Sequence, residues 1–138
     1  MSRVFKDPDT DEWYYPDNSY ILSETDSDGI ILYANELFCE IAGYTKEELI
    51  GEPHNLVRHS DMPRIAFKGL WADIRAKGFW SGYVKNSTKS RGYYWVFAIV
   101  LRQVAKDGTI TYLSIRTKPS REDVKKYSNL YAQLLREQ

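Results

Sequence analysis

The sequence predicts an α+β domain with one antiparallel sheet and helices on one face of it. Three observations favour this class. Two strand-like runs come first, at 20–25 and 30–34; a block of helical patterns follows; and three further strand-like runs fill most of 80–117. Strands that flank a block of helices, instead of alternating with them, are typical of α+β folds. The 138 residues suffice for one domain with a single core.

The first 18 residues predict an N-terminal arm rather than a core element. They are polar at first, then aromatic at Trp13, Tyr14 and Tyr15, and then interrupted by Pro16. Three adjacent aromatic side chains are costly to expose to water. We therefore expect the arm to dock, either on a sheet face of its own domain or on a second subunit.

The runs at 20–25 and 30–34 predict a β-hairpin, because residues 26–29 supply the turn sequence Asp-Ser-Asp-Gly. Two short helices follow. Asn35 can cap the first, which runs to about residue 42, and the segment 45–48 has the pattern of a capping box for the second.

A longer helix is expected after the loop 53–60. Asp61 or Ser60 is the predicted cap, and Pro63 is tolerated in the first turn, where no backbone N–H is required. Helical spacing predicts one apolar face, with the end of the helix at Gly78. The face comprises Ile65, Ala66, Leu70 and Ile74, with Phe67 and Trp71 beside it.

The first strand after the helices alternates, which places Trp80 and Asn86 on one face. The next strand, 93–103, is apolar on both faces, so both should be covered. The helices cover one face, and the arm or a partner covers the other. Residues 109–117 form the last strand.

The C-terminal helix begins with a second capping box, Ser120 to Asp123. Its apolar stripe spans two heptads, which is short for a coiled coil. Pairing with another helix and packing on its own domain are equally compatible with the stripe. It consists of Val124, Tyr127, Tyr131 and Leu134.

Composition narrows the function. Acidic and basic residues balance at 19 each, without a basic stripe, so we expect no nucleic-acid partner. The single cysteine, Cys39, excludes an internal disulfide and suits a reducing cytoplasm. No signal peptide and no apolar run near the roughly 20 residues of a membrane span are present, and no pattern suggests an enzyme.

The loop before the long helix concentrates polar chemistry, with His54, Arg58, His59 and Asp61 close together. They are compatible with the wall of a pocket, where an arginine could hold a phosphate, or with a surface loop that caps a helix. Either histidine is also a candidate haem ligand, although no haem-attachment motif is present. Two histidines without supporting ligands do not make a metal site.

Trp80 and Asn86 form a second candidate pair. A tryptophan plane can stack on a flat ring, and an asparagine amide can both donate to and accept from the edge of that ring. The alternative is that Trp80 is a core residue and Asn86 ends the strand.

Several segments together resemble a known family. They are D-x-x-G-I-I-L-Y-A-N at 26–35, F-C-E-I-A-G-Y-T-K-E-E-L-I-G-E-P-H-N at 38–55, V-R-H-S-D-M-P at 57–63, W-S-G-Y-V-K-N at 80–86, Y-W-V at 94–96 and Y-L-S-I-R-T at 112–117. The chain resembles a PAS domain over about residues 20–120. The histidine-containing motif and the W-S-G motif point to the flavin-binding PAS domain of bacterial aerotaxis receptors.

The resemblance implies a five-stranded antiparallel sheet and a cleft that holds FAD non-covalently, ahead of FMN or haem. Arg58, His59 and Asp61 fall on the cofactor-binding loop of the family, and Trp80 falls beside the isoalloxazine. The remaining family positions with expected cofactor contacts are Asn35, His54, Asn55 and Asn86.

The implied function is a cytoplasmic sensor that reports redox state, oxygen or energy level to a signalling partner, either a chemoreceptor-type protein or a transmembrane signalling module. A ligand-free interaction module is the alternative, and a homodimer is compatible with both. The expected division is an arm at 1–18, the sensor domain at 19–119 and a signalling or linker helix at 120–138. Ser60 replaces the usual proline of the aerotaxis motif, and the photoactive-cysteine motif of light-oxygen-voltage domains is absent, so no photoadduct is expected.

Overall fold

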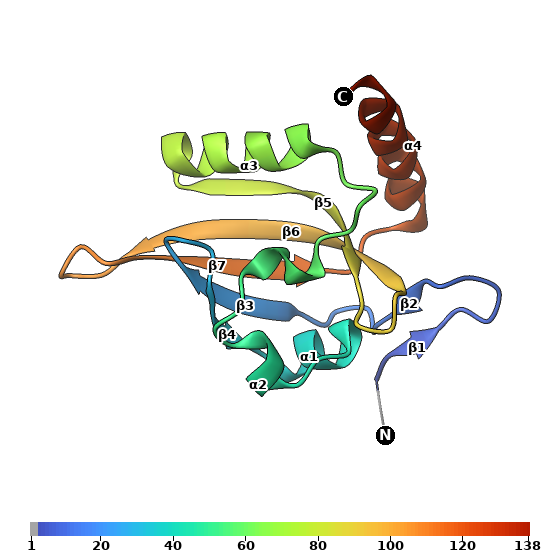
Figure 1. The fold of residues 1–138 in the computed structure, drawn as a ribbon, viewed down its shortest axis with the longest axis horizontal. Helices are drawn as coiled ribbons and strands as arrows, with labels where there is room; N and C mark the ends of the chain where they lie inside the picture. The colour runs from blue at the N-terminus through green and yellow to red at the C-terminus, as the bar shows by residue number, and fades with distance from the viewer. Residues whose placement is uncertain (1–2) are drawn as a thin grey trace.

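A computed structural model describes residues 3–138 and contains a five-stranded antiparallel sheet in the order β4-β3-β7-β6-β5 (Figure 1). The predicted α+β class and strand number are confirmed. The strands are β3 (Ile21–Asp26), β4 (Ile31–Ala34), β5 (Phe79–Ser87), β6 (Tyr93–Val104) and β7 (Ile110–Thr117).

Four helical segments connect β4 to β5: α1 (Glu36–Ala42), α2 (Lys46–Leu49), the 3-10 helix η1 (His54–Val57) and α3 (Arg64–Lys77). Asn35 caps α1, because its side chain accepts a hydrogen bond from the amide of Phe38, and the predicted capping box at Thr45 is present. These segments lie on what we call the inner face of the sheet.

The start of α3 differs from the prediction. Pro63 occupies the cap position, so the predicted cap at Asp61 or Ser60 is wrong. The first amide of the helix, that of Arg64, donates instead to the side-chain oxygen of Gln138 at 3.0 Å. A partner from another element explains the difference: the Asp61 carboxylate lies 2.8 Å from the ammonium of Lys85 on β5. The predicted apolar face of the helix holds at Leu70 and Ile74, which line the inner side, but it is wrong at Ile65, which is 60% exposed.

The N-terminal arm docks on its own domain. It forms a small hairpin of β1 (Phe5–Lys6) and β2 (Trp13–Tyr14). Tyr15 is buried in the main core, and its hydroxyl donates to the carbonyl of Trp95 on β6 at 2.8 Å. Tyr15 is therefore a core residue within the segment that the sequence predicts to be an arm rather than a core element.

The C-terminal helix α4 (Arg121–Glu137) packs on the opposite, outer face of the sheet. The ring of Tyr131 stacks on that of Trp95, and its hydroxyl donates to the carbonyl of Tyr83 on β5 at 2.6 Å. Cover on both faces of β6 is confirmed only for its first half, since Ile99 and Leu101 remain 36% and 37% exposed on the outer face. No helix that the structure describes is long and apolar enough to cross a membrane.

Candidate ligand cavity

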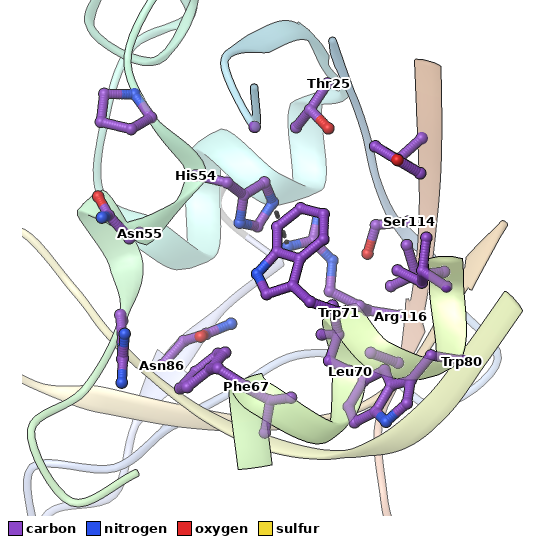
Figure 2. A pocket seen from close by; sticks show the side chains of 18 of the residues that line it. Thr25, His54, Asn55, Phe67, Leu70, Trp71, Trp80, Asn86, Ser114 and Arg116 are labelled. Atoms are coloured by element: carbon purple, nitrogen blue, oxygen red, sulfur yellow. Dashed lines mark hydrogen bonds between the residues drawn. The ribbon is translucent and has the colours of Figure 1, made fainter. Parts of the chain in front are cut away.

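A cavity of about 270 Å³ lies between α3, the η1 loop and the inner face of the sheet. Figure 2 shows side chains from all three converging on it. Its walls are aromatic and aliphatic, and polar groups gather at its deep end and near its mouth. The aromatic residues are Phe67 and Trp71 from α3, Trp80 from β5 and Tyr112 from β7.

Strand alternation determines which side chains of the sheet line the cavity. Trp80 and Asn86 on β5 both line it, as their shared face predicts. Gly82 lies between them, and a Cβ at this position would overlap the indole of Trp80. The glycine therefore lets the large ring lie flat along the strand, which fixes the plane of that wall.

The deep end of the cavity holds a polar network built on Arg116 of β7. One terminal nitrogen of its guanidinium donates to the Ser23 hydroxyl at 2.7 Å, and the other lies 3.2 Å from Nε2 of His54. The Ser23 oxygen also lies 3.0 Å from Nε2. Because a guanidinium can only donate, Nε2 must accept, so the His54 proton sits on Nδ1.

His54 is held neutral. Burial is the larger cause and the positive charge of Arg116 the smaller one, and together they lower the pKa of His54 from 6.5 to about 3. Burial also lowers the pKa of Arg116, but only to about 10, so the arginine stays charged near neutral pH. The deep end thus presents one cation and one neutral imidazole.

Arg58 and Asn55 stand near the mouth, where both are exposed. The guanidinium of Arg58 lies 4.0 Å from the centre of the Phe67 ring. Backbone pairing of Arg58 with Asn86 anchors the loop to β5. A permanent cation at the mouth is suited to a phosphate group.

Five of the eight predicted site residues therefore line one cavity: His54, Asn55, Arg58, Trp80 and Asn86. The other three lie outside its lining. Asp61 pairs with Lys85, and the ring of His59 accepts the amide N–H of Asp61 at 2.9 Å. The Asn35 side chain caps α1 and bonds to the backbone of β3. These three side chains shape the segments around the cavity.

Sequence reasoning missed Arg116, together with Thr25, Tyr112 and Ser114. One signal was available, because Tyr112, Ser114 and Arg116 alternate along one strand and must share a face. The side to which that face points depends on long-range pairing, such as Ala98 with Arg116.

The comparisons with known proteins agree on one family. A family model described as PAS fold matches residues 31–101. The aerotaxis receptor of Escherichia coli is 40% identical over 118 residues, 86% of this chain and 23% of the receptor. A nitrogen fixation regulatory protein of Klebsiella oxytoca is 31% identical over 78 residues, 56% of this chain and 16% of that protein. The chain thus spans a quarter or less of these relatives.

Solved structures agree on the fold. A light-oxygen-voltage domain studied with a flavin analogue superposes with a TM-score of 0.71 at 17% identity, covering 83% of this chain and 88% of that one. A PAS domain from Colwellia psychrerythraea gives 0.66 at 19% identity, covering 74% and 87%. At these identities the likeness supports the architecture alone.

Proposed function

This chain belongs to the PAS family, and from that membership and its cavity we propose that it is a sensory domain that binds FAD and reports the redox state of the flavin to a signalling partner. The carrying observation is the cavity itself, which combines aromatic walls with hydrogen-bonding groups at its deep end. This combination suits a flat heteroaromatic ring with polar edges.

The volume of the cavity indicates that only part of the proposed ligand would lie inside it. Pockets for small molecules usually begin at about 300 Å³, so a cavity of about 270 Å³ suits a ring system better than a whole dinucleotide. The ring would lie inside, and the diphosphate and adenosine would extend past the mouth. Arg58 and Asn55 line this part of the cavity. In the proposed complex, Arg58 would bind phosphate and Asn55 would bind a sugar or phosphate oxygen.

The protein residues would bind and orient the ring. Trp80 and Phe67 supply flat apolar contact, while Asn86 supplies an amide that both donates and accepts. A bound flavin would supply electron uptake and release, which no side chain of this cavity provides. We assign His59, Asp61 and Asn35 an indirect part in binding, because they hold the loop and α1 in place.

The same geometry argues against haem. An axial histidine ligand needs a free ring nitrogen inside the cavity. The inward nitrogen of His54 is already within hydrogen-bond distance of Ser23 and Arg116, and His59 does not line the cavity. A flavin requires no such ligand.

Signalling requires that a partner distinguish two states of this domain, which must bind that partner with different affinity. We propose that the outer face of the sheet, with α4 and the arm, carries this difference to a chemotaxis-type signalling protein. Tyr83 supports the proposal, since it belongs to a cavity-lining strand and contacts α4 from the other face.

The first test is an absorbance spectrum of the purified protein, followed by heat release and identification of any chromophore. We expect a two-banded flavin spectrum and FAD as the released compound. A sharp Soret band would instead support haem. A folded, colourless protein that stays colourless after incubation with FAD would support the ligand-free interaction module.

A further inference from the structure

Arg116 is an unusual lining residue because it is a buried cation. Its side chain is only 2% exposed, and it comes from the middle of the sheet on β7. Its guanidinium lies over the ring of Phe38, 4.4 Å from the ring centre, and against the Ser23 hydroxyl. These neighbours are neutral, so none of them balances its charge.

Its charge has no counter-ion among residues 3–138. The ion pairs of this part of the chain involve other arginines, lysines and histidines. Its Nε is also buried without a hydrogen-bond partner. A buried charge without a partner destabilises the fold, and a buried donor without an acceptor destabilises it further. Such a group is expected where a ligand completes it.

We propose that Arg116 is the charge-matching residue of the cavity: it contacts the ring edge of the bound flavin and favours the reduced, negatively charged ring over the neutral oxidised ring. This inference rests on the proposed function. The electron comes from a one-electron donor, which is dithionite in the experiment below. No bond breaks, and the added negative charge stays on the ring beside the guanidinium.

His54 fits this role as a neutral neighbour. Because its Nε2 must accept from Arg116, it adds no second positive charge and helps to orient the guanidinium. Arg116 would then be the cation nearest to the ring. Arg58 lies at the other end of the cavity, beside Phe67 and close to solvent.

The test measures the preference for reduced over oxidised FAD as the midpoint potential of the one-electron couple of the protein-bound flavin, by stepwise anaerobic reduction with dithionite followed by absorbance. Arg116→Gln removes the charge but keeps donors for Ser23 and His54, whereas Arg116→Lys keeps the charge. An opposite charge within about 4–6 Å typically changes such an equilibrium tenfold or more. We expect Arg116→Gln to lower the preference for reduced FAD about tenfold, which corresponds to 59 mV for a one-electron couple. Arg116→Lys should retain most of the preference.

Arg102→Gln is the matched control. Arg102 lies on the neighbouring strand β6, where its guanidinium contacts backbone carbonyls at the end of α3. The Arg102→Gln variant should have the same preference for reduced FAD as the wild type. A folded Arg116→Gln protein with the same preference as the wild type would overturn the inference while leaving flavin binding intact. If Arg116→Gln does not fold, loss of the preference in folded Arg116→Lys would overturn it. A wild type that binds neither form of FAD would refute the proposed function itself.

Discussion

Single residues define the cavity, and Trp80 is the clearest case. Its indole lies flat because Gly82 has no side chain, and its strand position was predictable from alternation alone. Arg116 was not predictable in the same way, because its partners Ser23 and His54 are 93 and 62 residues away in sequence. Local patterns indicate which residues share a face, but not which distant residues meet it.

Trp80→Ala should reduce FAD affinity at least about tenfold without unfolding the domain, because it removes the aromatic wall. Binding can be measured by quenching of flavin fluorescence. Ile65→Ala is the control, since Ile65 is an exposed apolar residue of α3 that does not line the cavity. Full flavin occupancy in Trp80→Ala would contradict the assignment of this wall.

Arg58→Ala should weaken FAD and FMN binding about tenfold, the usual order of a charged hydrogen bond, and leave riboflavin binding unchanged. Riboflavin shares the ring but lacks phosphate, so calorimetric titration with the three ligands isolates the proposed phosphate contact. Arg64→Ala, an exposed arginine at the start of α3, should bind all three normally. Equal loss for riboflavin would place Arg58 at the ring instead.

His54 should make the protein less stable in mild acid. Its pKa is about 3 in the folded protein and about 6.5 in the unfolded chain, so only the unfolded chain binds this proton between those values. The free energy of unfolding should therefore fall as the pH drops below about 6.5, and His54 contributes no slope above it.

Urea unfolding of the apoprotein at several pH values measures this effect. His54→Gln should flatten the slope below pH 6.5. His59→Gln should flatten it less, because burial lowers the pKa of His59 while the neighbouring Asp61 opposes that shift. Equal slopes for the wild type and His54→Gln would mean that the folded imidazole takes up its proton over the same pH range as in the unfolded chain.

Elements follow the sequence where their stabilising contacts are local. The caps of α1 and α2 were predictable because donor and acceptor lie within three residues. The start of α3 was not, since Lys85 on β5 takes the carboxylate that would have capped it. The apolar stripe of α4 predicted that one face of this helix is buried. Contacts of Tyr131 with β5 and β6 determine that this face packs on the outer face of the sheet.

Tyr131→Phe should destabilise the protein by about 1 kcal/mol, because it removes a hydrogen bond to the Tyr83 carbonyl while keeping the stacked ring. Chemical denaturation monitored by circular dichroism provides the measurement. Tyr20→Phe is the control, since Tyr20 is 57% exposed. A loss in Tyr131→Phe no larger than in the control would show that this hydrogen bond contributes little to stability.

At the scale of the whole molecule, a single sheet separates the cavity from α4. Motif resemblance was sufficient to predict the class, the number of strands and the inner helices. The docking of the arm through Tyr15 depends on a hydrogen bond to Trp95, 80 residues away, which no local pattern encodes. The arm also contacts the start of α4 there, because Arg121 pairs with Glu12.

The strand order also means that segments which pair in the sheet are synthesised at different times. β3 lies between β4 and β7, and Ser23 meets Arg116 across 93 residues. Ribosomes add about 5–20 residues per second, so roughly 5 to 20 s pass between the appearance of these two side chains. During that interval, the edge of β3 that will pair with β7 remains unpaired in the hairpin of β3 and β4. A ligand held by both His54 and Arg116 can therefore be bound fully only after β7 has been synthesised.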